Sequence, residues 1–385
     1  MKNIAVCFIG VASVVIAIFV FRPEVFSSLQ VQAAQQQLAR CNQRDEATRQ
    51  QCAKGAIRRA VSLYGIDTAL GAVGAVFSNQ NSGQLCHDLT HLIGQEAYRM
   101  YARDEHVPIT PKTTYCSYGF FHGVSEALAA ASGDVRDVRA FCEYVIRESQ
   151  LVGPDPEYQC YHGLGHGTVN PHDPALWGDP IAMASPAIAL CREVAQTSHQ
   201  LESCGTGIFA GIASFFSQNE YGLTVDKNDP FWVCMNVPLD FREPCFRDMS
   251  SVAMVAAGGD WRKAVTYIED IPEDSYALGA MRTFGIDLSM VDISICRSVQ
   301  TRIRSACIED FVRQTWQDSR PGEEFASMFV LCSSSGLDDN EGEVCWRYSF
   351  GYLRMFKSAQ QRVVCDQVKD QKYKTMCSEY ISNEI

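Results

Sequence analysis

The sequence predicts an all-α fold: an irregular solenoid, or array, of helical hairpins that are stapled by disulfides, behind an N-terminal transmembrane helix. Three observations predict it. Cysteines fall into eight closely spaced neighbouring pairs, apolar residues recur at helical spacing on both sides of these pairs, and the chain begins with a long uncharged apolar run. No alternating pattern typical of β-strands recurs along the sequence.

The N-terminal apolar run spans residues 4–21, close to the ~20 residues that a helix needs to cross a bilayer. We therefore expect residues 1–21 to form an uncleaved signal-anchor helix with Lys2 on the inner side, and residues 22–40 to form a linker. A cleaved signal peptide is the alternative, since residues 31–33 fit a cleavage site. We expect a single-pass membrane protein whose bulk is periplasmic or extracellular, and both alternatives export that bulk.

The cysteines after Cys7 alternate between short and long gaps, so pairing of neighbours is the simplest disulfide scheme. Such a scheme belongs to an oxidising compartment outside the cytoplasm. Apolar helical stretches often end at the first cysteine of a pair and begin at the second, so we expect each pair to close a helix–turn–helix unit. Each disulfide would stabilise the fold by about 3 kcal/mol, because it restricts the conformations of the unfolded chain. The pairs are Cys41/Cys52, Cys86/Cys116, Cys142/Cys160, Cys191/Cys204, Cys234/Cys245, Cys296/Cys307, Cys332/Cys345 and Cys365/Cys377.

Composition and charge narrow the classes of partner. The chain has 385 residues with 46% hydrophobic and 20% charged residues, which is ordinary for a globular protein. A net charge of -12 disfavours binding to nucleic acid, because such binding needs clustered Lys and Arg. We divide the array into histidine-bearing repeats at 41–215 and histidine-poor repeats at 216–385.

Glycines three and seven residues after a cysteine define a frame that three repeats share. On a helix, these two positions lie on one face and allow a neighbouring backbone to approach closely. The third copy keeps the glycines and lacks the histidines of the first two, so the packing does not require imidazole. The frame consists of Gly119 and Gly123, Gly163 and Gly167, and Gly207 and Gly211.

Five of the eight histidines fall in three motifs that each begin at a cysteine between residues 86 and 167, and we expect them to bind a metal: His87, His91, His122, His162 and His166. Two pairs stand four residues apart, which places both members of a pair on one helix face. Glu126 stands four residues after His122 and could add a carboxylate ligand. With the thiols consumed as disulfides, nitrogen and oxygen ligands suit zinc first, and copper or iron as alternatives.

Two carboxylates are candidates for catalysis in this cluster. With an open zinc position, Glu126 or Asp88 could act as general base on a bound water. Asp88 could instead orient a ligating imidazole, or stabilise the start of a helix. Gly163, Gly165 and Gly167 would each weaken a helix by about 1 kcal/mol, so a loop is the alternative for the third histidine motif.

Two classes of function fit the sequence. The first is a membrane-tethered metal-binding protein, either non-catalytic or a metal-dependent hydrolase or oxidoreductase acting on a small molecule. The second is a disulfide-stapled scaffold that binds another protein of the cell envelope, with the histidines packed in a hydrogen-bond network with tyrosines. No H-E-x-x-H, G-x-S-x-G, Walker or Rossmann motif occurs, so the commonest enzyme classes lack their signatures.

Overall fold

The structure is a computed structural model, and every described element in it is helical. It describes residues 23–43, 46–77, 83–104, 106–131, 134–148, 155–169, 173–285, 292–318, 324–333, 337–354 and 359–382. Within these ranges there is no β-strand, so the predicted all-α class is confirmed.

The first half of the chain holds the histidine-bearing helices. Its elements are α2 (Pro23–Ala39), η1 (Arg40–Gln43), α3 (Glu46–Tyr64), α4 (Ile66–Phe77), α5 (Gly83–Asp104), η2 (Pro111–Thr114), α6 (Tyr115–Ala131), α7 (Val135–Glu148), α8 (Pro156–Thr168), η4 (Pro174–Leu176), α9 (Pro180–Val194) and α10 (Ser198–Gln218). The predicted boundary between residues 215 and 216 falls inside α10, so the array continues through it.

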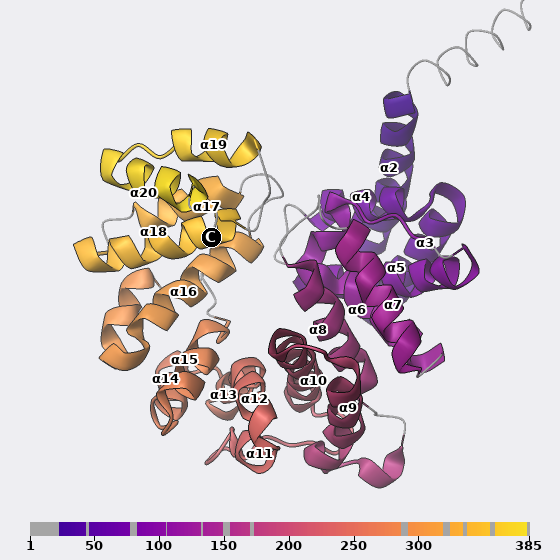
Figure 1. Cartoon of the computed structure of the whole chain (residues 1–385). Helices are drawn as coiled ribbons and strands as arrows, with labels where there is room; N and C mark the ends of the chain where they lie inside the picture. Colours follow the sequence, from indigo (N-terminus) through magenta and orange to yellow (C-terminus); the bar gives the residue numbers. More distant parts are fainter. Residues whose placement is uncertain are drawn as a thin grey trace, which may run out of the picture.

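The second half begins with short helices and ends with longer ones. Its elements are α11 (Trp232–Asn236), η5 (Leu239–Phe241), α12 (Arg242–Asp248), α13 (Ser250–Ala256), α14 (Trp261–Glu269), α15 (Asp274–Arg282), η6 (Ile293–Ser298), α16 (Thr301–Asp318), α17 (Glu324–Cys332), α18 (Asp339–Arg354), α19 (Ala359–Asp366) and α20 (Gln371–Ser382). The array curves strongly, so that α16 to α20 return towards the side of α4 to α8 (Figure 1).

Disulfides join all eight predicted neighbour pairs, with Cα atoms 5.3 to 5.8 Å apart. Most bonds link two successive helical segments, as between α7 and α8 or between α17 and α18. The predicted pairing of neighbours is therefore confirmed, but Cys86 lies at the start of α5 rather than at its end, so its bond to Cys116 spans the whole helix. Eight disulfides also indicate an oxidising environment outside the cytoplasm.

The linker expected at residues 22–40 is wrong for the described part, because residues 23–39 form α2. Its Ala34 and Leu38 are buried in the core, and the helix packs against α4. The segment lacks glycine and has its proline at the first helical position, where proline is tolerated, so its Ala, Gln and Leu residues favour a helix.

The signal-anchor expected at residues 1–21 lies outside the described residues. Among the helices that the structure does describe, none is both long enough and apolar enough to cross a membrane.

Glycines let α5, α6, α8 and α10 pack with their backbones in contact. A Cβ atom on Gly123 of α6 would overlap the His91 carbonyl of α5, and one on Gly207 of α10 would overlap the His162 carbonyl of α8. The predicted close approach is confirmed at these positions. Gly211 differs, since a Cβ there would meet Val169 at an ordinary 3.5 Å.

The third histidine motif is helical, so the loop alternative is wrong. It forms α8, which begins after Asp155, whose side chain accepts a hydrogen bond from the Tyr158 amide at 2.9 Å. The low helix propensity of the three glycines is offset by packing: Gly163 and Gly167 contact α6, and Gly165 contacts α10.

Candidate metal centre

Three neighbouring helices bring the five predicted histidines into one cluster. Helix α5 supplies His87 and His91, α6 supplies His122, and α8 supplies His162 and His166. Neighbouring rings have centroids 4.9 to 5.8 Å apart across all three helices. The four-residue spacing and the glycine contacts together explain why these histidine rings cluster. Helices whose backbones are in contact place the side chains on their facing sides within reach of each other.

His87, His91 and His122 form a group that could hold a metal ion. Each offers one nitrogen, and the three nitrogens lie within 4.8 Å of one another. The closest pair is His122 Nδ1 and His87 Nε2, at 3.2 Å. Two nitrogens bound to a tetrahedral zinc at 2.0–2.1 Å lie about 3.3 Å apart, so this pair already has the separation of two ligands.

Two of these imidazoles have an acceptor on the side away from the shared point. His87 Nδ1 lies 3.0 Å from the carbonyl oxygen of Cys116, and His91 Nδ1 lies 3.2 Å from Glu126 Oε2. A carbonyl or carboxylate oxygen can only accept, so each Nδ1 carries the hydrogen and each Nε2 keeps its lone pair. This is the arrangement in which metal-bound histidines are normally found.

The Nε2 atom of His91 is buried and has no hydrogen-bond partner among the described residues. A buried polar atom without a partner costs about 1–3 kcal/mol. A metal ion bound to this nitrogen would remove that cost.

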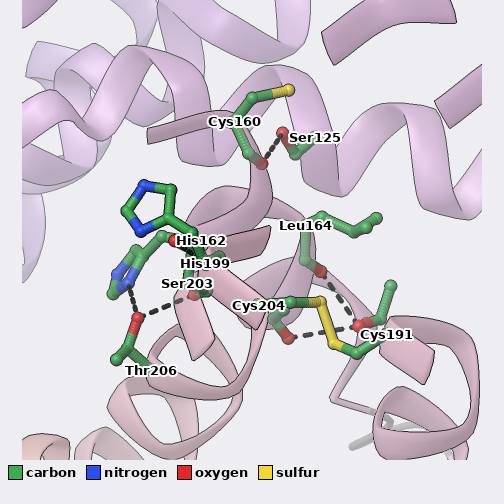
Figure 2. Close-up of a disulfide and its surroundings, with 11 residues drawn as sticks. Ser125, Cys160, His162, Leu164, Cys191, His199, Ser203, Cys204 and Thr206 are labelled. Atoms are coloured by element: carbon green, nitrogen blue, oxygen red, sulfur yellow. Dashed lines mark hydrogen bonds between the residues drawn. A yellow bond between two sulfur atoms is a disulfide. The ribbon is translucent and has the colours of Figure 1, made fainter. Parts of the chain in front are cut away.

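His162 is oriented in a similar way by α10. Its Nδ1 lies 2.9 Å from Thr206 Oγ1, and the Thr206 hydroxyl donates to the Ser203 carbonyl at 2.7 Å, beside the Cys191–Cys204 disulfide (Figure 2). The hydroxyl therefore accepts from His162, which leaves the Nε2 of that ring unprotonated. His166 stacks on His122, with centroids 5.2 Å apart and planes 14° from parallel.

Burial keeps the imidazoles of His122, His162 and His166 neutral. It lowers the pKa of His122 well below its usual value, the pKa of His162 to about 3 and the pKa of His166 to about 4, and neighbouring imidazoles add to each decrease. Neutral imidazole is the form that binds a metal, so no proton has to be removed from most of these groups at neutral pH.

Glu126 lies behind His91. Its Oε2 also accepts from Gln95 Nε2 at 3.0 Å. Burial raises the pKa of Glu126, but the hydrogen bonds from His91 and Gln95 outweigh it, so the net pKa lies below the usual value and the group is ionised. Its position suits orientation of His91 better than the predicted roles of ligand or general base.

Asp88 lies on α5 at the edge of the cavity into which the cluster opens. The orienting role expected for it is taken by the Cys116 carbonyl for His87 and by Glu126 for His91. Its predicted role as general base stays a prediction.

The cavity has a volume of about 1080 Å³ and is lined from both halves of the chain. The histidine cluster forms one part of its wall. Another part comes from the histidine-poor repeats at 216–385, and it contains Arg247, Asp248, Arg313, Trp316 and Tyr352. No motif marks these residues; the curvature of the array brings them to the same cavity.

Tyr158 connects the two parts of the wall. Its ring stacks on His162 with centroids 5.3 Å apart, and its hydroxyl lies 3.3 Å from Thr206 Oγ1. The Arg247 guanidinium lies 5.6 Å from the centre of the same ring. The histidine cluster and the arginines are therefore parts of one continuous site.

Fold and site together define a disulfide-rich helical protein with a three-histidine group that could bind a metal ion. No protein-family model, no curated protein and no solved structure matches the chain.

Proposed function

We propose that the protein is an extracytoplasmic metalloprotein in which His87, His91 and His122 bind one transition-metal ion. The observation that carries this proposal is the nitrogen geometry: three nitrogens within 4.8 Å, one pair at 3.2 Å, and acceptors behind two of the rings. Tethering by the N-terminal apolar run is part of the same proposal.

Zinc is the metal that we favour, with copper and iron as alternatives. Three neutral imidazoles without a thiolate suit all three metals, and three protein ligands leave a tetrahedral zinc with one open position. A water at this position would acquire a pKa of about 7 and could attack a substrate in the cavity. A copper or iron ion would instead support redox chemistry. His162 and His166 would complete the coordination sphere or hold a second ion.

A purely structural histidine network is the competing explanation, and it belongs to the scaffold alternative. It accounts for the hydrogen bond between His122 and His87 and for the one from His162 to Thr206. It leaves His91 Nε2 buried without a partner among the described residues, and it gives no reason for a charged Glu126 behind that ring. These two features favour the metal.

Elemental analysis of the full chain, purified from an oxidising compartment without chelators, tests the proposal. We expect about one equivalent of a transition metal per chain, and a loss of it in the double variant His87→Ala/His122→Ala. His106→Ala is the matched control, because His106 is exposed and bonds to Tyr144 outside the cluster. Wild-type protein with less than about a tenth of an equivalent would overturn the proposal.

A further inference from the structure

Two half-buried arginines and an aspartate line the cavity beyond Tyr158. Arg247 and Asp248 lie at the end of α12, and Arg313 lies on α16. We call these three residues the arginine wall. Nothing in the proposed metal site requires cations at this place, so they call for another explanation.

Arg313 is fixed from behind. The Asp310 carboxylate is fully buried, is not among the residues that line the cavity, and pairs with the Arg313 guanidinium. Arg313 Nε also donates to the carbonyl of Arg282 at 3.0 Å. A guanidinium held in this way presents a rigid set of donors, which matches the planar geometry of an oxyanion.

Arg247 is held from two sides. Its Nη1 donates to Glu202 Oε1 at 3.1 Å, and its guanidinium lies over the ring of Tyr158. About a third of its side chain stays accessible, so it can contact a ligand in the cavity. Its ion pair with Glu202 therefore positions it without covering it.

Asp248 carries an oxygen with no hydrogen-bond partner among the described residues, namely its buried Oδ2. Burial raises its pKa to about 7, although Arg247 and Arg313 act in the opposite direction and Glu202 adds to the increase. Burial, and next to it the charge of Asp248, raise the pKa of the Tyr158 hydroxyl on α8. Asp248 can therefore be protonated near neutral pH and can then donate a hydrogen bond.

The hydrogen-bond donors of this region, rather than its net charge, favour an anion. Two arginines against Glu202 and the buried Asp310 give a net charge of 0 when Asp248 is protonated and of -1 when it is ionised, so an anion would be held by the accessible guanidinium N–H groups. Trp316, stacked on Tyr352 with centroids 5.3 Å apart, adds an aromatic surface next to the charges. A small molecule with an oxyanion at one end and an apolar part fits this combination.

We propose that the arginine wall binds the oxyanion group of a small organic molecule, such as a phosphate, sulfate or carboxylate, and presents that molecule to the metal site. The proposal deepens the proposed function, because the metal would act on the molecule bound here. Binding of the oxyanion itself requires only the arginine wall, so the two proposals can fail separately.

Calorimetric titration of the full chain with inorganic phosphate, sulfate or acetate tests the inference. We expect Arg247→Gln to weaken binding of the preferred anion at least about tenfold, as expected for loss of a charge-assisted contact. Arg262→Gln, an exposed arginine on α14, is the matched control and should bind as the wild type does. Arg313→Lys keeps the charge opposite Asp310 and should weaken binding through loss of the planar donor set.

Asp248→Asn adds a readout that a merely structural role would not change. Wild-type affinity for sulfate, whose own charge does not change between pH 6 and 8, should fall as the pH rises over this range because the Asp248 proton is lost, and the affinity of the variant for sulfate should stay constant. The inference is overturned if none of the three anions binds, or if Arg247→Gln and Arg262→Gln bind equally well. Metal content of the same samples separates the cases: a metal-loaded protein without anion binding contradicts this inference alone, and anion binding without metal contradicts the proposed function alone.

Discussion

The Nδ1 atom of His122 lies 3.2 Å from the Nε2 atom of His87, although 35 residues separate the two in the chain. Because His87 Nδ1 donates to the Cys116 carbonyl, the hydrogen between the two rings belongs to His122. A metal ion shared by both nitrogens would take the place of this hydrogen. Binding of the metal would therefore require the His122 hydrogen to move from Nδ1 to Nε2, with no net loss of a proton from this neutral ring, and the two rings would need little rearrangement.

The contact between α5 and α6 gives a first prediction. Replacement of Gly123 with Ala would place a methyl group against the His91 carbonyl and push the two helices apart, so we expect a loss of about 1–3 kcal/mol in the free energy of unfolding. Chemical denaturation of the metal-free protein measures it. Gly211→Ala is the matched control at the same frame position, and it should leave the free energy unchanged or raise it by up to about 1 kcal/mol. Equal effects of the two changes would contradict the account.

Glu126 gives a second prediction. The isosteric change Glu126→Gln removes the charge behind His91, lowers the basicity of that imidazole and should weaken metal binding by about 10- to 100-fold. Competition with a chromogenic chelator measures the affinity. Glu96→Gln removes a carboxylate on the same helix as His91 that pairs with exposed Arg99, and it should have no effect. Unchanged affinity in Glu126→Gln would exclude an orienting role for this carboxylate.

Acid should destabilise the metal-free protein. His162 and His166 have folded-state pKa values of about 3 and about 4, below the value of 6.5 expected in the unfolded chain. The unfolded state therefore binds more protons between these limits, so stability is complete above about pH 6.5 and decreases as the pH falls towards 4. The raised pKa of Asp248, about 7, has the opposite effect on stability. This effect comes from one carboxyl group, whereas three buried imidazoles have lowered pKa values, so we expect a net loss of stability in acid.

The free energy of unfolding, measured at several pH values between 4 and 7, tests this third prediction. His162→Gln should show a shallower decrease than the wild type, since it has one fewer imidazole to protonate. His106→Ala, which alters an exposed histidine, should show the wild-type slope. A wild-type free energy that stays constant down to pH 4 would contradict the account.

Features that depend on local geometry could be predicted from the sequence. The alternation of short and long cysteine gaps was enough for all eight disulfides, because every bond joins cysteines that are neighbours in the chain. The histidine cluster followed from the four-residue spacing on α5 and α8 and from the glycine frame, since both depend on the geometry of a helix face.

Features that depend on the curvature of the whole array could not be predicted. Arg247 and Arg313 meet the cavity only because the helices after α10 bend back towards α8, and no local pattern encodes that bend. The position of residues 23–39 after an apolar run predicts a linker, but their composition favours the helix that the structure shows. The three glycines of α8 showed that packing can outweigh low helix propensity.

The position of a metal ion tests the central claim most directly. Crystals of the full chain loaded with zinc should give an anomalous-difference peak at the zinc edge about 2.0–2.1 Å from His87 Nε2 and His122 Nδ1, with His91 as the third ligand. The same map from the His87→Ala/His122→Ala variant should lack this peak. A zinc-loaded crystal in which the hydrogen bond between His87 and His122 persists, with no peak between them, would contradict the account.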